Sequence, residues 1–129
     1  MPKYYKYEKA IFTKRPEGNR NEVFFDGWAI GMREIARHPH VHCKISGMIT
    51  EADWTSWQSD HFKRYLDVVF EAFGPDRVMY GSDWPVCLLA GTYPDVINLV
   101  RTHTNAFSES EEQRLFGENG AKFYGIEQV

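Results

Sequence analysis

The sequence contains only two cysteines, Cys43 and Cys87, among its 129 residues. Two cysteines do not make the disulfide framework that holds many small secreted domains together. Neither cysteine lies at a spacing from the histidines that is typical of a zinc site. The simplest interpretation is a pair of reduced thiols in a cytosolic protein, so we expect a cytoplasmic location.

Long apolar runs and a strong excess of one charge are also missing. No apolar stretch approaches the ~18–20 residues that a membrane-spanning helix needs. The first residues, MPKYYKYEK, lack the apolar middle of a secretion signal. The formal net charge of −3 gives no electrostatic reason to expect nucleic acid or an anionic membrane. We therefore expect neither as a partner.

Apolar residues are nevertheless plentiful enough for a packed core. Hydrophobic residues make up 43% of the sequence and aromatic residues 16%. Such a composition is not that of a disordered chain, and the length is that of one domain.

Helical patterns dominate the sequence from Asp26 onward. Asp26 has the residue type of an N-cap, and the helix that it would begin is expected over Gly27–Arg37. A single helical turn is expected near Ala52–Trp57. Further helices are expected over Asp60–Phe73, Pro94–Arg101, from the Ser108 capping box toward Phe116, and in a last turn over Asn119–Tyr124.

Two short segments between these helices are expected to be strands, at Val41–Ser46 and Val78–Gly81. In the first, Val41, Cys43 and Ile45 share one face, and His42, Lys44 and Ser46 share the other. A further short strand is predicted at Ala10–Thr13. Strands that alternate with long helices favour an α/β fold with parallel pairing.

Ligand sites in such folds lie beyond the carboxyl ends of the strands. One strand here ends at Ser46-Gly47-Met48, and the other runs into Ser82-Asp83-Trp84. A carboxylate at the end of a buried strand is costly unless something uses it. Asp83 is therefore either a cap of the following turn or the working group of a site.

The histidine-rich stretch HPHVH looks like a metal site but is placed at the wrong end of its strand. His38, His40 and His42 enter the strand instead of leaving it. At ~3.3 Å per residue, the first two lie on the order of 15 Å from the far end. We interpret them as surface and lower-core histidines.

Two motifs together, "VHCKISGMITEADW" and "FGPDRVMYGSDWPV", resemble the amidohydrolase superfamily, most closely its sugar-lactonase and pyrone-dicarboxylate-lactonase branch. The ending "SESEEQRLFGENGAKFYGI" is also similar, and the resemblance covers roughly residues 26–126. It implies the C-terminal portion of a TIM-like (β/α)8 barrel, with Val41–Ser46 and Val78–Gly81 as its last two strands. Because a complete barrel needs at least ~200 residues, the barrel is incomplete in this chain. Residues 1–25 form a divergent N-terminal segment.

The resemblance further implies that Asp83 is the catalytic aspartate. In metal-using members it touches a divalent metal and activates water; in metal-free relatives it is a general base alone. The family's HxH pair after strand one has no counterpart here, and "KAIFTKRP" lacks the Asp-His pair that normally ends strand six. Two states stay open: one zinc or manganese ion, or no metal.

Other residues near the strand ends are candidates for substrate binding. Lys44 either orients substrate or forms an ion pair, and Ser46 either bonds a ligand or is structural. Trp84 either walls the pocket or packs its loop, and Met48 lies in the loop after the first strand. Cys87, with no histidine beside it in the sequence, is not expected to be a nucleophile.

Two functions of different classes remain. The first is a hydrolase that opens a lactone, a cyclic ester such as a sugar lactone, with Asp83 as general base. The second is a truncated, non-catalytic barrel fragment that acts as an isoform, a remnant or an assembly partner. Its open strand edges favour a homo-oligomer.

Overall fold

The computed structural model describes residues 7–9 and 20–126, and its centre is a parallel sheet of three strands in the order β1-β2-β3. The strands are β1 (Tyr7–Lys9), β2 (His42–Ile45) and β3 (Val78–Tyr80). In the register of β2 and β3, Cys43 pairs with Val78 and Ile45 with Tyr80. The two strands predicted at residues 41–46 and 78–81 and their parallel pairing are confirmed. The strand predicted at Ala10–Thr13 lies outside the described residues.

The first helix, α1 (Arg20–Ala36), begins well before the predicted start. Asp26 lies inside this helix and is exposed, so its assignment as N-cap was wrong. The physical reason is that the apolar stripe already includes Phe25, whose ring packs edge-on against Tyr65 at 5.2 Å. Since Phe25 gains this contact only as part of the helix, helical structure extends upstream of it.

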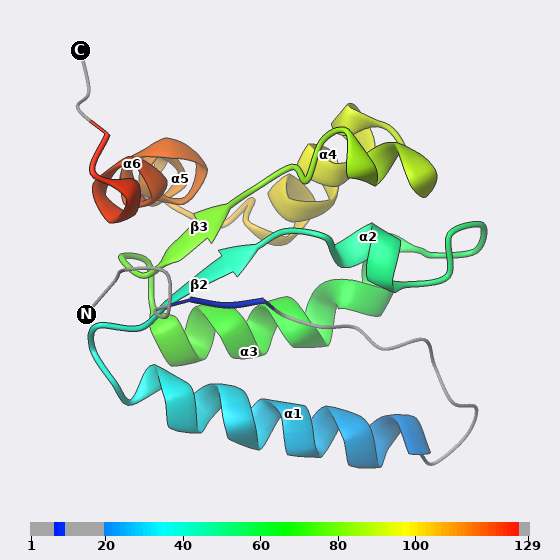
Figure 1. Cartoon of the computed structure of the whole chain (residues 1–129), viewed down its shortest axis with the longest axis horizontal. Helices are drawn as coiled ribbons and strands as arrows, with labels where there is room; N and C mark the ends of the chain where they lie inside the picture. The colour runs from blue at the N-terminus through cyan, green and yellow to red at the C-terminus, as the bar shows by residue number, and fades with distance from the viewer. Residues whose placement is uncertain (1–6, 10–19, 127–129) are drawn as a thin grey trace.

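The strongest helical pattern of the sequence forms α3 (Lys63–Phe73), after a 3-10 turn, η2 (Ser59–Phe62). The helix predicted over residues 60–73 is confirmed, and its first turn is a 3-10 turn instead of an α-helical one. Gly74 ends the helix with a φ of 72°, a conformation that glycine adopts without steric cost. Figure 1 shows α3 against the sheet and α1 packed on the far side of α3.

Two short turns lie between β2 and α3. The first is the helical turn α2 (Met48–Glu51), begun by Gly47 at a φ of 68°. The second is at the predicted place, residues 52–57: the Trp57 amide donates to the Asp53 carbonyl oxygen at 3.1 Å, and the Asp53 carboxylate caps this turn by accepting hydrogen bonds from the amides of Thr55 and Ser56. These bonds, that from Thr55 foremost, lower the pKa of Asp53.

The chain after β3 is helical, as predicted. A 3-10 turn, η3 (Val86–Leu89), leads to α4 (Tyr93–His103), which the Thr92 capping box opens. Next come α5 (Glu109–Gln113), a π-helical turn η4 (Arg114–Glu118) and α6 (Asn119–Tyr124). Asn119 ties α6 to β3, since its Nδ2 donates to the carbonyl oxygens of Pro75 and Val78.

One face of the sheet carries the apolar core. Cys43, Ile45 and Val78 pack there with buried residues of α1, α3 and α4, among them Met32, Leu66, Val69, Phe73, Leu99 and Val100. The other face presents His42, Lys44 and Ser46, all half-buried. Among the described residues, no helix combines the length and apolar character needed to cross a membrane.

Candidate active site

The carboxyl ends of β2 and β3 lie side by side. The Gly81 amide donates to the Ile45 carbonyl oxygen at 2.9 Å, which places Ser46 opposite Gly81. The two predicted strand-end segments, residues 46–48 and 82–84, therefore leave the sheet at the same edge. This is the edge at which parallel α/β folds place their ligand sites.

Asp83 adopts an unusual backbone conformation at this edge. Its φ of 57° makes it the single non-glycine residue with a positive φ in the described parts of the chain. Aspartate tolerates this left-handed region better than most residues, and such positions recur at functional sites. Its carbonyl oxygen accepts a hydrogen bond from the Cys87 amide at 2.9 Å, which ties the turn to η3.

The Asp83 carboxylate is not a turn cap. Among the residues that the structure describes, no protein group donates a hydrogen bond to it, and the cap is instead Ser82, whose Oγ accepts the Trp84 amide at 3.2 Å. The carboxylate is half-buried at the end of β3. It is thus left able to bind water, substrate or a cation.

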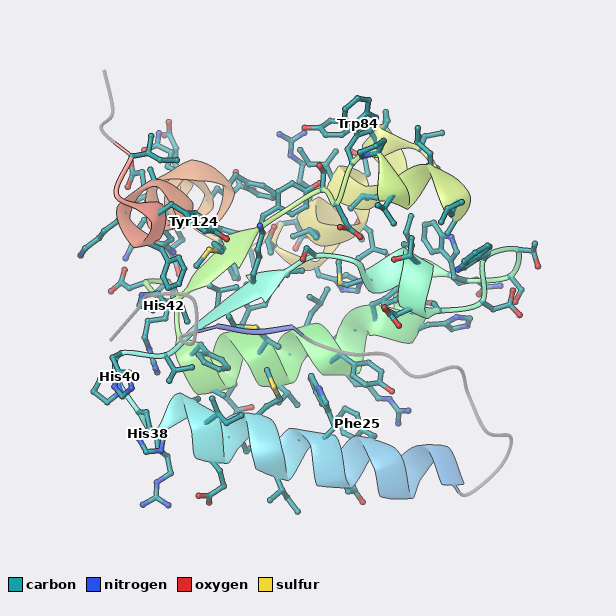
Figure 2. The ribbon with its side chains drawn as sticks, in the orientation of Figure 1. Phe25, His38, His40, His42, Trp84 and Tyr124 are labelled. Atoms are coloured by element: carbon teal, nitrogen blue, oxygen red, sulfur yellow. The ribbon has the colours of Figure 1, made fainter. Side chains whose placement is uncertain are left out.

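Trp84, the neighbour of Asp83, is exposed over 62% of its surface. Figure 2 shows it at the upper edge of the molecule, away from His38 and His40 at the lower left, which are both exposed. His42 is half-buried and its ring packs on Phe123 at 5.0 Å. The three histidines are thus remote from the Asp83 end of the sheet, in agreement with their interpretation as surface and lower-core residues.

Lys44 extends from β2 across its neighbouring strand. A Cβ added to Gly81 would lie 2.6 Å from Lys44 Cε and 3.3 Å from Ser46 Cβ, so the lysine stem fills the space above this glycine and would have to shift for a larger residue. Lys44 Nζ donates to the Tyr124 hydroxyl at 3.3 Å. The sequence left an ion pair open as an alternative role of Lys44. In the described parts of the chain, Lys44 forms no such pair.

Two other residues near the site are fully buried. Met48 is 2% exposed and belongs to the apolar core, so we leave it out of the proposed substrate pocket. Cys87 is 1% exposed and carries a free thiol. Its burial agrees with the expectation that it is not a nucleophile.

The described residues do not supply the ligands of a metal centre. No three or more histidine, cysteine, aspartate or glutamate side chains gather there in a way that could hold an ion. Asp83 is one suitable oxygen ligand, whereas zinc sites in proteins take three or four. One carboxylate alone does not fit a zinc or manganese site.

Three further residues of the site had weak signals in the sequence or none. Gly81, directly after an apolar strand, is the kind of glycine that marks a close approach, here by Lys44. Tyr124 bonds Lys44 across 80 positions of sequence, and Trp57 bonds the carbonyl oxygen of Ala90 across 33. No local pattern indicates such long-range pairs.

Comparison with known sequences agrees with the family resemblance of the sequence motifs. The amidohydrolase family model matches residues 16–126. An L-fucono-1,5-lactonase of Burkholderia multivorans is 44% identical over 115 residues, which are 85% of this chain and 39% of the relative. An L-fucono-1,5-lactonase of Burkholderia ambifaria is 35% identical over 106 residues, 79% of this chain and 36% of the relative. The chain thus spans less than half the length of these relatives.

Solved structures of amidohydrolases are also similar to this chain. A crystal structure of an amidohydrolase from Burkholderia multivorans with bound HEPES superposes with a TM-score of 0.79 and 42% identity, over 84% of this chain and 40% of that one. A second crystal structure from that organism, with bound zinc, gives a TM-score of 0.78 and 40% identity, over 82% of this chain and 39% of that one. The family match over most of the chain and these superpositions agree: the chain belongs to the amidohydrolase family and spans about 40% of the length of these relatives.

Proposed function

We propose that this chain contributes to the hydrolysis of a sugar lactone, with Asp83 as the general base. The observation that carries the proposal is the half-buried Asp83 carboxylate at the carboxyl end of β3, which has no hydrogen-bond donor among the described residues. The lactonase names of two similar proteins point to the substrate class. We further propose that the three strands are part of a (β/α)8 barrel, in which this edge is the catalytic one.

The proposed reaction needs one proton acceptor that later becomes a donor. Asp83 takes a proton from water while the water oxygen attacks the lactone carbonyl carbon. The bond from that carbon to the ring oxygen then breaks, and the protonated Asp83 returns its proton to the departing alkoxide. The product is an open-chain hydroxy acid, and Asp83 is again a carboxylate.

Neighbouring polar groups are proposed to hold the substrate. The Lys44 ammonium faces the same side of the sheet as Ser46 and passes over Gly81, two residues before Asp83. A positive charge there stabilises negative charge on the carbonyl oxygen as the water attacks. The exposed Trp84 ring is proposed as a wall of the substrate pocket, because an aromatic face packs well on a sugar ring.

The test is hydrolysis of L-fucono-1,5-lactone and other aldonolactones by the purified chain, with spontaneous hydrolysis subtracted. We expect Asp83→Asn to lower the enzymatic rate by about a hundredfold or more, as for loss of a general base. Asp26→Asn is the matched control, since Asp26 is exposed on α1. Assays with added zinc or manganese establish whether a metal contributes. Turnover that is equal in Asp83→Asn and Asp26→Asn would rule out the proposed base.

A second candidate function is association with another copy of this chain. Five large apolar side chains are exposed in the segment that follows β3, namely Trp84, Val86, Leu88, Leu89 and Tyr93. Exposed apolar clusters of this kind often mark interfaces. Sedimentation over a range of protein concentrations tests it: a dimer that Leu89→Lys converts to monomer supports association, and a monomer at all concentrations contradicts it.

A further inference from the structure

The Lys44 ammonium group contacts Tyr124, a residue near the C-terminal end of the described chain. Its Nζ lies 3.3 Å from the Tyr124 hydroxyl oxygen and 5.4 Å from the centre of the Tyr124 ring. The ammonium group therefore has both a hydrogen-bond acceptor and an aromatic ring beside it. Figure 2 shows Tyr124 on α6, next to β3.

The helix that presents Tyr124 is itself firmly attached to the sheet. Asn119, at the beginning of α6, donates to the carbonyl oxygens of Pro75 at 2.6 Å and Val78 at 2.9 Å. Phe123 packs on the His42 ring at 5.0 Å. Tyr124 is 47% exposed, and these contacts hold the helix from which its side chain projects.

The lysine stem passes over Gly81, two residues before Asp83. A Cβ at residue 81 would lie 2.6 Å from Lys44 Cε, so the stem occupies the space that a side chain there would need. The ammonium then lies 3.6 Å from that Cβ position, beside the strand end that leads to Asp83. An ammonium group has three donors, and Tyr124 takes one of them. In the described parts of the chain, no other protein acceptor takes the remaining two.

We propose that Tyr124 is a positioning residue, which holds the Lys44 ammonium over Gly81 with two donors directed to a ligand at the Asp83 end. The inference rests on the proposed lactonase function and adds to it the chemical group that is recognised. That group is the ester carbonyl of the lactone, which becomes the carboxylate of the ring-opened product. A carboxylate is the partner that an ammonium group binds most strongly through charge-assisted hydrogen bonds.

The first experiment does not depend on turnover. The side-chain ammonium signals of a 15N-lysine-labelled chain are recorded by NMR, and the Lys44 signal is assigned by its loss in Lys44→Arg. We expect Tyr124→Phe to shift this signal and to speed its hydrogen exchange several-fold, because the acceptor is removed while the ring remains. Tyr93→Phe is the matched control, since Tyr93 is also 47% exposed. An unchanged Lys44 signal in Tyr124→Phe overturns the proposal.

The second experiment separates positioning from a structural role. In lactone hydrolysis we expect Tyr124→Phe to raise KM several-fold with a smaller effect on kcat, and Lys44→Arg to retain more activity than Lys44→Met. Unaltered KM in Tyr124→Phe, or a loss that follows a lowered melting temperature, overturns the positioning role. If the unmodified chain has no turnover, the lactonase proposal fails, and the NMR comparison alone decides whether Tyr124 positions Lys44.

Discussion

The indole N–H of Trp57 donates a hydrogen bond of 2.7 Å to the carbonyl oxygen of Ala90. This bond joins the loop after β2 to the segment after β3, the two segments that flank the candidate site. The Trp57 ring also lies beside the neighbouring Gly91, where an added Cβ would be 3.4 Å from it, at van der Waals contact. The two halves of the site are therefore connected by a half-buried side chain in addition to the sheet.

Replacing Trp57 by Phe tests this connection. We expect the free energy of unfolding to fall by about 1–2 kcal/mol, because the Ala90 carbonyl loses its donor and the ring becomes smaller. We also expect kcat/KM for lactone hydrolysis to fall, because the two loops then move more independently. Urea unfolding and the lactone assay measure the two effects.

Trp54→Phe is the control for this change. The Trp54 indole also donates to a backbone carbonyl, that of Thr50 at 2.8 Å, but this partner is only four positions away and the Trp54 side chain is exposed. We expect its effect on stability to stay within about 0.5 kcal/mol. Equal losses in the two variants would show that the bond between the loops has no special importance.

Arg77 joins three parts of the fold through backbone carbonyls. Its guanidinium donates to Phe73, at the end of α3, and to Ala36, at the end of α1. It also donates to His38 and Val41, which lead into β2. A lysine cannot reproduce this fork of donors, so we expect Arg77→Lys to cost about 3 kcal/mol.

Chemical denaturation of Arg77→Lys and of a control variant tests that expectation. Arg37→Lys is suitable, because the Arg37 guanidinium pairs with the exposed Glu34 carboxylate, at 3.4 Å. Exposed pairs of this kind contribute little, so the control is expected to change stability by less than about 0.5 kcal/mol. An Arg77→Lys variant as stable as the Arg37→Lys control would mean that the four carbonyl contacts are replaceable.

Local sequence patterns were sufficient for β2, β3, α3 and the helices after β3. Each of these elements is defined by apolar spacing, caps and terminating glycines within a few residues. The start of α1 was missed because Asp26 has a capping residue type, while the decisive contact of Phe25 is with the distant Tyr65. The position of Asp83 after a strand was predictable, but its left-handed φ was not.

The supporting contacts of the site are beyond such patterns. Lys44 was a candidate from its place on β2, yet its partner Tyr124 lies 80 positions away and is selected by the packing of α6. Met48 is a second case, since its place in a rim loop suggested a pocket, whereas its side chain is buried in the apolar core from α2. Tertiary packing, which no short window contains, decides both cases.

The capping box of α5 predicts a pH effect in acid. The Ser108 amide donates to the Glu111 carboxylate at 3.1 Å, and this bond lowers the pKa of Glu111 from its ordinary value of 4.5. A carboxylate with a lowered pKa stabilises the folded state above the ordinary value and loses that contribution as pH falls through the folded value. We therefore expect the stability difference between the unmodified chain and Glu111→Gln to shrink below pH 4.5.

Thermal melts across this range measure the effect. Glu112→Gln is the control, because Glu112 is in the same first turn but outside the capping box. The difference in melting temperature between the unmodified chain and Glu112→Gln is expected to depend less on pH than that for Glu111→Gln. A pH dependence that is identical for Glu111→Gln and Glu112→Gln would contradict a role of the capping box.

The buried Tyr80 hydroxyl predicts how stability changes at alkaline pH. Its hydroxyl is buried without a hydrogen-bond partner in the described structure, and burial raises its pKa from 10.0 to about 12. The unfolded chain therefore releases this proton before the folded chain does, so the free energy of unfolding falls as pH rises between these two values. Tyr80→Phe removes both the unpaired hydroxyl and its ionisation. We expect this variant to be about 1 kcal/mol more stable near neutral pH and to lose less stability above pH 10.0.

Thr104→Val separates the two parts of that expectation. The Thr104 hydroxyl is likewise buried without a partner in the described structure, but it does not ionise in this range. Its replacement is therefore expected to give a similar gain near neutral pH and no change in the alkaline dependence, as measured by urea unfolding at a series of pH values. If Tyr80→Phe is destabilising, its hydroxyl has a partner after all, and the raised pKa needs a different cause. If both variants respond alike to alkali, Tyr80 is not the group whose ionisation weakens the fold.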